Sequence, residues 1–464
     1  MRTIQEPSRR IPVIAEVDVV VCGGGPGGLP AAIAAARHGA KTLLIERYGF
    51  LGGLATAGLV APILGHHAHN SSQPIVEGLL REITERMHAL GGAPTWEETL
   101  ARWGINFDAE TFKRVADLLV QEAGVELLLH TLVTDVVVQD GRIAAVIIEN
   151  KSGRQAIAAK VVVDATGDAD VAYRAGAPTK QGRDFDGKVE SMGSFMHLAG
   201  LPSLTDEARR AAVEQVRQAM AAGKLRFYNP GFLGVNDMRP DHTSPNMTRF
   251  AGDPTDGGDM TQAELSVRRD VWDLVAFLRD QVPGMEGVYL AATSPQVGPR
   301  ESRQIVGGYA LTGQDVHAGA KFADAIARGS WWVDIHCPLG NTYPVHLCIV
   351  ECPRQESCPF WAAEHGRMFT RQGDQGTVYP PDGDWYDIPY RCLVPNAIDN
   401  LLVSGRCISA THEGMAGARV MGTCFAIGQA AGTAAALAAQ ANGRPRDVDV
   451  AQLRAALGAD GALV

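Results

Sequence analysis

Residues 17–46 read VDVVVCGGGPGGLPAAIAAARHGAKTLLIE and predict a strand, a glycine-rich turn, a helix and a second strand. The first strand is built mainly from valines, the helix is rich in alanine, and the second strand, at residues 42–45, ends at the acidic residue Glu46. Three glycines have the G-x-G-x-x-G spacing of dinucleotide-binding units: Gly23, Gly25 and Gly28. Glu46 follows about 20 residues later, where a βαβ unit places a carboxylate that binds a ribose.

Each glycine has a separate task in such a unit. Gly23 allows the tight turn, Gly25 lets the backbone approach a pyrophosphate, and Gly28 lets the helix pack closely on the strand. The N-terminus of the helix then offers unpaired N–H groups and a positive dipole end to the phosphates. A glycine-rich turn of some other α/β protein is the alternative, but it leaves the agreement of strand, helix and acid unexplained. We therefore predict that this part of the chain binds a dinucleotide.

The composition is that of an ordinary soluble globular protein. The 464 residues are 46% hydrophobic and 20% charged, and a net charge of −10 argues against nucleic acid and anionic membranes as partners. Residues 1–16 lack the apolar core of a signal peptide. The longest apolar run, 420–439, consists mostly of small residues and predicts a close-packed buried helix. We expect a cytoplasmic protein without membrane insertion, whose eight cysteines are reduced.

Helix and strand patterns continue after the first unit. Residues 107–124 have the apolar spacing of an amphipathic helix. Strand-like runs follow it, at residues 125–129, 133–138, 143–148 and 160–163. Between two of these runs, Asp140-Gly141 predicts a type I′ hairpin turn.

The middle of the chain has a different character. Residues 200–285 favour helices, and one of them is expected to begin at the capping box Thr261-x-x-Glu264 and to stop before Pro283-Gly284. Residues 330–385, rich in Trp, Pro, Cys and Gly, predict loops.

The end of the chain returns to the earlier pattern. From Ile388 onward strand, turn and helix signals reappear, with a buried strand into a glycine turn at residues 400–406 and a long helix from Val420. We therefore expect one cofactor domain made of both ends of the chain and a substrate domain inserted between them. The predicted division is 1–180 and 386–464 for the cofactor domain, and 181–385 for the insertion.

Four blocks of the sequence resemble the FAD-dependent oxidoreductases that neighbour the fumarate reductase and succinate dehydrogenase flavoproteins. The blocks are VVVCGGGPGGLPAAIAAARHGAKTLLIERYGFLGGLATAG (19–58), VVVDATGDADVAYRAGA (161–177), QVGPRESRQIVGGYALT (296–312) and IPYRCLVPNAIDNLLVSGRCISATHEGMAGARVMGTCFAIGQAAGTAAA (388–436). In two-domain flavoproteins of the glutathione-reductase type, a C-terminal strand–glycine segment meets the ribityl chain and a helix N-terminus faces the isoalloxazine ring. The resemblance implies an α/β fold, with a Rossmann-like FAD-binding domain and an inserted α+β substrate domain.

The resemblance also implies which residues hold FAD. The ADP half and the pyrophosphate are expected at Gly23, Gly25, Gly28, Glu46, Arg47, Gly52 and Gly53, with Val133 flanking the adenine and Ala165, Thr166 and Gly167 nearby. The ribityl chain and the ring are expected at Gly405, Arg406, Met421 and Gly422. The succinate dehydrogenase flavoproteins carry a flavin-linking histidine before the paired glycines. Because residues 47–51 contain no histidine, we expect FAD to be bound non-covalently.

The candidate catalytic residues are Arg300 and His336. Flavin catalysis needs a proton donor or acceptor and a group that polarises the substrate. Arg300 would grip a carboxylate or carbonyl oxygen, and Asp334 would orient His336 as a general base. The alternatives are a surface or interdomain ion pair formed by the element Arg300-Glu301-x-Arg303 and a hydrogen-bonded loop histidine at position 336. His412, before the flavin-facing helix, is a further candidate for a shifted pKa.

No metal site is expected, although two groups of residues invite one. The first group is a run of histidines on a predicted loop, His66, His67 and His69. The second is a set of cysteines, Cys337, Cys348, Cys352 and Cys358. Histidines on a loop are more often solvated or hydrogen-bonded, and the cysteine spacing lacks the C-x₂-C pairs of zinc and iron–sulfur sites.

The leading functional interpretation is an FAD-dependent oxidoreductase or dehydrogenase that transfers a hydride between a small organic substrate and flavin N5. The sequence has one G-x-G-x-x-G unit and no dedicated nicotinamide domain, so dioxygen, a quinone or a protein carrier would reoxidise the flavin. The alternatives are a redox-neutral isomerase or lyase and an FAD-bearing subunit of a larger complex. A nicotinamide-only dehydrogenase fits Glu46 but leaves the C-terminal block unexplained. The substrate and the oligomeric state, including a homo-oligomer, stay open.

Overall fold

The computed structural model describes the chain apart from residues 1, 6, 185, 234–237, 339–378 and 442. Five strands form a parallel sheet in the order β5-β2-β1-β8-β15, namely β1 (Val13–Cys22), β2 (Thr42–Ile45), β5 (Glu126–Leu128), β8 (Gly153–Asp164) and β15 (Leu401–Val403). Buried β-branched and leucine side chains fill the centres of β1, β2, β8 and β15, as is typical of a sheet covered on both faces. The expected α/β fold with a Rossmann-like sheet is confirmed.

The strand β8 also belongs to an antiparallel ribbon. Its first residues pair with β7 (Arg142–Asn150), and β7 pairs with β6 (Leu132–Gln139). The turn between these two strands has φ values of 49° at Asp140 and 74° at Gly141, and positive φ at both positions is what a type I′ turn requires. The predicted hairpin is therefore confirmed. The strand predicted at 160–163 begins earlier, at Gly153, because the first residues of β8 pair with β7.

The helices α1 (Gly28–Arg37) and α11 (Met421–Gln440) cross in close contact on the sheet. A Cβ atom at Gly428 would lie 2.3 Å from the carbonyl oxygen of Gly27, and one at Gly432 would lie 2.0 Å from that of Ala31. The small residues of both helices therefore let the two backbones touch. The helix α11 is long and apolar enough to span a membrane. However, 89% of its most apolar 18-residue stretch is buried inside the protein, as in a core helix.

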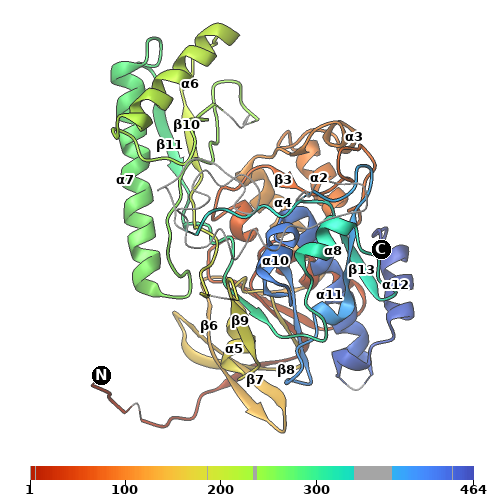
Figure 1. Cartoon of the computed structure of the whole chain (residues 1–464). Helices are drawn as coiled ribbons and strands as arrows, with labels where there is room; N and C mark the ends of the chain where they lie inside the picture. Colours follow the sequence, from red (N-terminus) through yellow and green to blue (C-terminus); the bar gives the residue numbers. More distant parts are fainter. Residues whose placement is uncertain (1, 6, 185, 234–237, 339–378, 442) are drawn as a thin grey trace.

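A second hydrophobic core lies beside the first. It is formed around α6 (Asp206–Ala221), α7 (Gly257–Gln281), β10 (Met196–Ala199) and β11 (Tyr289–Thr293), which Figure 1 shows together on one side of the molecule. Its buried members lie between Met192 and Val297, whereas Ile305, Val316 and Ile335 join the large core. The division of the chain at residues 181 and 386 remains a prediction.

The start of α7 differs from the sequence prediction. The helix begins at Gly257, where the side chain of Asp256 accepts a hydrogen bond from the N–H of Asp259. Thr261 lies inside the helix and donates to the carbonyl oxygen of Gly257 at 2.7 Å, while Glu264 accepts from the N–H of Val297 at 2.6 Å. The capping box at Thr261 was therefore wrong, because an aspartate cap one turn earlier starts the helix.

The remaining elements connect and flank these layers. The helices are α2 (Leu79–Ala89), α3 (Trp96–Leu100), α4 (Ala109–Glu122), α5 (Asp170–Arg174), α8 (Gly313–Ala318), α10 (His412–Ala418) and α12 (Val450–Ala459). The strands are β3 (Ile63–Leu64), β4 (Gly104–Ile105), β9 (Thr179–Gln181), β12 (Arg303–Ile305), β13 (Ala325–Gly329) and β14 (Tyr386–Pro389). Short 3₁₀ turns occur at η1 (Gly53–Ala55), η4 (Tyr390–Cys392), η5 (Gly405–Cys407) and η6 (Pro445–Asp447). The helix α4 confirms the amphipathic helix predicted at 107–124.

Candidate functional site

The carboxyl ends of the parallel strands border a cleft of about 1070 Å³. Its walls include the residues that directly follow β1, β2, β8 and β15, which is where open α/β sheets bind their ligands. The predicted cofactor residues that line it are Gly23, Gly25, Glu46, Arg47, Gly53, Val133, Ala165, Thr166, Gly167, Gly405, Arg406 and Met421. The structure therefore brings both ends of the chain together around one cleft.

Three predicted cofactor residues support the cleft without lining it. A Cβ atom at Gly28 would lie 1.7 Å from the carbonyl oxygen of Gly23, so only glycine fits between the turn and α1. Gly52 has a φ of 111°, and its N–H donates to the carbonyl oxygen of Gly24. A Cβ atom at Gly422 would lie 2.5 Å from the carbonyl oxygen of Leu64. These glycines allow close backbone packing behind the cleft.

The N-termini of two helices border this region, and in α1 the N–H groups of Gly28 and Leu29 donate to the carbonyl oxygen of Gly25. The residues that precede α1 and α11 are Gly27 and Val420, and neither supplies a side-chain cap. The first N–H groups of an uncapped helix lack intrahelical partners and carry a partial positive charge. Because Gly27 and Met421 both line the cleft, one helix end suits a pyrophosphate and the other a negatively charged ring edge.

Glu46 is held in place at the end of β2. Its Oε2 accepts a hydrogen bond from the N–H of Gly24 at 2.7 Å, and its Oε1 accepts one from the N–H of Tyr48 at 2.9 Å. Burial raises the pKa of this carboxyl, whereas the two N–H donors oppose the rise. The carboxylate therefore fixes the glycine turn and retains lone pairs that suit ribose hydroxyls.

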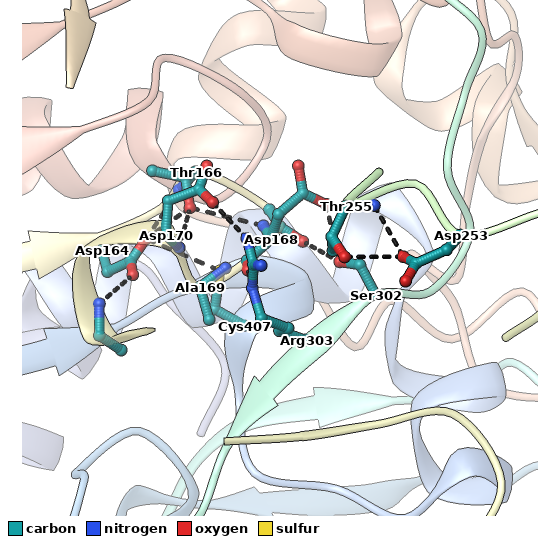
Figure 2. A network of polar contacts seen from close by, with 12 residues as sticks. Asp164, Thr166, Asp168, Ala169, Asp170, Asp253, Thr255, Ser302, Arg303 and Cys407 are labelled. Carbon is teal, nitrogen blue, oxygen red and sulfur yellow. Dashed lines mark hydrogen bonds and ion pairs between the residues drawn. The ribbon is translucent and has the colours of Figure 1, made fainter. Parts of the chain in front are cut away.

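The loop after β8 is tied to the C-terminal part of the chain (Figure 2). Asp168 accepts a hydrogen bond from the hydroxyl of Ser302 at 2.7 Å and lies 3.2 Å from the guanidinium of Arg406. Arg303 donates to the carbonyl oxygen of Asp168 at 3.0 Å. At the start of the loop, burial raises the pKa of Asp164 to about 6. These contacts fix the cleft wall that Ala165–Gly167 and η5 share.

A second cavity of about 870 Å³ adjoins the cleft. Four residues line both: Leu54, Arg406, Arg419 and Met421. The predicted catalytic residues Arg300 and His336 both line the second cavity. Sequence reasoning therefore selected two side chains that the fold places together beside the end of the cleft bordered by α11.

His336 lies beside Asp334, as the sequence suggested, and also contacts Arg249. Its Nδ1 accepts a hydrogen bond from Nη2 of Arg249 at 3.0 Å, so in the neutral ring the hydrogen is on Nε2, 3.5 Å from Asp334. Burial and the positive charge of Arg249 hold the pKa of His336 well below its usual value. This geometry favours a neutral hydrogen-bond donor over the general base expected from the Asp334-x-His336 pattern.

Arg300 does not pair with its neighbour Glu301. Its guanidinium donates to the carbonyl oxygen of Ser191 at 2.6 Å and to the side-chain oxygen of Asn246 at 3.2 Å. Glu301 instead contacts His412, with 2.7 Å between Oε2 and Nδ1 and both side chains buried. Burial alone would lower the pKa of His412, but the Glu301 carboxylate raises it to about 9.

Sequence reasoning missed several residues of this site. Arg419 forms a bidentate ion pair with Glu190, at 2.9 Å and 3.1 Å, and Glu190 also accepts from the N–H of His336 at 3.0 Å. Asn246 and Arg249 come from a loop before α7. None of these residues belongs to a local motif, although Arg419 lies in the C-terminal block that carried the family resemblance.

Two of the suspected metal ligands form contacts with backbone carbonyl oxygens instead, although Nδ1 of His66 is buried without a hydrogen-bond partner among the described residues. His66 lies 3.1 Å from the carbonyl oxygen of Thr99, and burial lowers its pKa to about 4. His67 contacts the carbonyl oxygen of Arg102 at 2.9 Å. Within the described part of the chain, no group of three or more His, Cys, Asp or Glu side chains is arranged to hold a metal ion. Of the suspected cysteines, Cys348, Cys352 and Cys358 lie outside the described residues.

Part of the chain is similar to several curated proteins. The thiamine thiazole synthases of Methanococcus vannielii and Methanococcus aeolicus are 31% and 33% identical to it over 165 and 169 residues. These matches cover 33% and 34% of this chain and 57% of each relative, so the chain spans little more than half of their length. A dihydrolipoyl dehydrogenase of Trypanosoma brucei brucei is 56% identical over 45 residues, which are 10% of this chain and 9% of that protein.

A family model matches most of the chain, and solved structures of low sequence identity also align with it. A geranylgeranyl bacteriochlorophyll reductase-like protein from Thermoplasma acidophilum is 13% identical, covers 97% of this chain and 84% of its own, and has a TM-score of 0.42. A flavin-dependent brominase is 14% identical, covers 96% and 83%, and has a TM-score of 0.44. The model described as FAD dependent oxidoreductase matches residues 18–457. A closer kinship with glutathione reductase or the fumarate reductase flavoproteins stays a prediction. The chain is an FAD-dependent enzyme and belongs to the FAD-dependent oxidoreductase family.

Proposed function

We propose that the enzyme transfers a hydride between a small organic substrate in the second cavity and N5 of FAD bound in the cleft. The observation that carries this proposal is the shared wall of the two cavities, formed by Leu54, Arg406, Arg419 and Met421. A substrate beside this wall would lie next to the end of the cleft that the C-terminal helix α11 borders. FAD supplies the redox chemistry by accepting or donating a hydride at N5.

The residues of the cleft fit FAD. The Gly23–Gly25 turn and the N-terminus of α1 would hold the pyrophosphate, and Glu46 would accept the ribose hydroxyls. Gly405 and the N-terminus of α11 would lie against the ribityl chain and the ring. The positive end of α11 would stabilise negative charge on the ring edge. Because residues 47–51 contain no histidine, we propose that FAD is held without a covalent bond to this segment.

In this proposal the side chains of the second cavity bind and orient the substrate. The guanidinium of Arg300 would hold a substrate oxygen, and the Nε2–H of His336 would donate to an oxygen of the reacting group. Leu54, Val60 and Pro62 on the apolar wall would exclude water from the reacting atoms. Dioxygen, a quinone or a protein carrier would complete the redox cycle.

The variant His336→Ala tests this assignment. Because His336 does not line the FAD cleft, the variant is expected to keep the flavin spectrum of the wild type. Loss of a positioned donor is expected to slow flavin reduction by substrate about a hundredfold. Anaerobic stopped-flow spectra would measure the rate, with His38→Ala, a surface histidine paired with Asp460, as the control. An unchanged reduction rate would remove His336 from the reaction.

If the flavin stays oxidised with every organic donor in a broad screen, hydride transfer is wrong and a redox-neutral role is favoured.

A further inference from the structure

We propose that the substrate of the second cavity is a monocarboxylate with an aromatic body, bound with its carboxylate at Arg300 and its ring against Trp103 and Trp331. The inference rests on the proposed function, because it names the class of molecule that the same cavity would bind. Three features carry it: the charge of the polar end, the donors that this end leaves available, and the aromatic side chains of the lining.

Among the described residues, a charged cluster at the polar end of the cavity carries one positive charge in excess. It consists of Arg300, Arg419 and Asp334, which line the cavity, and of Arg249 and Glu190, which contact lining residues from behind. Arg419 is neutralised by the bidentate pair with Glu190, and Asp334 lies 3.5 Å from Arg419 and lines the cavity. One negative charge on a ligand therefore balances this cluster.

Three neighbouring groups in the described part of the chain add no net charge to this cluster. His336 is neutral, because burial and Arg249 lower its pKa. Arg406, on the wall shared with the cleft, is paired with Asp168 at 3.2 Å. The His412–Glu301 pair behind the cavity is neutral as a unit.

Two of the guanidinium groups are poorly compensated. Among the described residues, neither Arg249 nor Arg300 forms an ion pair with a carboxylate. Their hydrogen-bond partners are neutral groups, and Arg249 also lies over the ring of Tyr228, with 3.6 Å between Cζ and the ring centroid. Arg249 is 5% exposed, and its Nε is buried without a hydrogen-bond partner. A buried guanidinium without a counter-ion is unfavourable, and an entering anion removes that penalty. This arrangement is therefore typical of an anion site.

The two arginines are held side by side. The side-chain oxygen of Asn246 accepts hydrogen bonds from Nη1 of Arg249 at 2.8 Å and from Nη2 of Arg300 at 3.2 Å. A Cβ atom at Gly193 would lie 3.0 Å from Nη1 of Arg300, so the glycine leaves room for the guanidinium against the backbone. Arg300 uses two of its five N–H donors in these contacts, and the others can bind a carboxylate.

Another part of the cavity lining is apolar and aromatic. Trp103, Trp331 and Phe195 line it, and the rings of Trp103 and Trp331 are 6.2 Å apart between centroids. Trp103 is 57% exposed, an unusual position for a large aromatic side chain unless it contacts a ligand. A second carboxylate on the ligand would lose its hydration against this wall without a partner. The cavity therefore favours an aromatic monocarboxylate over a small dicarboxylate.

Isothermal titration calorimetry of the FAD-loaded protein tests whether the cavity prefers a ligand with a single negative charge and an aromatic ring. The probes are phenylacetate, its neutral isostere phenylacetamide, and succinate. We expect phenylacetate to bind at least about tenfold more tightly than the other two, because hydrogen bonds to charged groups contribute more than those to neutral ones. Equal affinity for phenylacetate and phenylacetamide, or tighter binding of succinate, would overturn the proposal.

Variants locate the two ends of the ligand. Arg300→Gln is expected to weaken phenylacetate by about ten- to a hundredfold and to leave phenylacetamide nearly unchanged. Trp103→Ala, at an exposed position, is expected to weaken both aromatic probes several-fold and to leave acetate unchanged. Arg391→Gln, which breaks an ion pair with Asp324 outside the cavity, is the matched control and should bind as the wild type does. If Arg300→Gln does not fold, the wild-type comparison and Trp103→Ala still decide.

Failure of this inference can be separated from failure of the proposed function. Rapid flavin reduction by neutral donors, combined with no preference for anions, would refute the monocarboxylate and leave hydride transfer standing. Arg300-dependent binding of phenylacetate, combined with no donor that reduces the flavin, would refute hydride transfer and leave the anion site standing.

Discussion

Replacing Arg419 by methionine is predicted to destabilise the fold, because it leaves the carboxylate of Glu190 buried without its partner. The guanidinium contacts this carboxylate at 2.9 Å and 3.1 Å, and the two side chains are 11% and 0% exposed. Methionine keeps much of the aliphatic volume of arginine, so the main change is the loss of charge and of hydrogen bonds. Glu190 would retain the N–H of His336 as a donor.

The size of the effect follows from the geometry. Two unit charges 2.9 Å apart attract each other by about 6 kcal/mol at an effective dielectric constant of about 20. Breaking a buried pair by removing one partner typically costs about 3–5 kcal/mol, because the remaining charge is left unpaired. We therefore expect the free energy of unfolding of Arg419→Met to fall by about 3–5 kcal/mol near neutral pH.

Urea unfolding followed by tryptophan fluorescence measures this loss. Adding Glu190→Gln to Arg419→Met should recover much of the stability, because a neutral amide is less costly to bury than a carboxylate. Burial already raises the pKa of Glu190, and removal of Arg419 raises it further. The penalty should therefore be largest above that raised pKa and should shrink as the pH falls through it. A loss below about 1 kcal/mol, or a double variant no more stable than the single one, would refute the reasoning.

Three further predictions concern the cofactor turn and a buried ion pair. A Cβ atom at Gly25 would meet nothing closer than Cα of Gly53 at 3.5 Å, so Gly25→Val is expected to fold but to lose FAD by obstructing the pyrophosphate. Normal FAD content in that variant would count against the assignment. Gly28→Ala is expected to yield misfolded protein, because its Cβ would lie 1.7 Å from the carbonyl oxygen of Gly23, and a native melting temperature would contradict this. The pKa of His412 is raised from 6.5 to about 9, so its pair stabilises the fold fully below about pH 6.5 and loses that contribution as the pH rises through about 9. The melting temperature of the wild type should fall as the pH rises across this range, and that of His412→Gln should depend less on pH. Identical pH profiles of the two proteins would contradict this prediction.

The local parts of the fold could be predicted because they depend on short patterns. The βαβ unit at 17–46, the helix at 107–124 and the turn at Asp140-Gly141 each need only residues close in sequence. The helix α10 was not predicted, because HEGMAGA contains two glycines that disfavour helix. It forms because Thr411 caps it and the surrounding core buries all of its residues.

The candidate site could be predicted only in part, for the same reason. The glycine positions and Glu46 belong to a motif, and most of them line the cleft. Arg300 and His336 were selected, but not their partners. His336 contacts Arg249, which lies 87 residues away in sequence, and Glu301 contacts His412 across 111 residues. No local spacing records such contacts, because tertiary packing alone brings these loops together.

The FAD content of the purified protein tests the account most directly. After incubation with FAD and removal of the free cofactor, the wild type should show a flavin absorption band in stoichiometric amount. Folded Gly25→Val, treated in the same way, should show none. A folded wild-type protein that shows no flavin band, even after FAD has been supplied, would contradict the account.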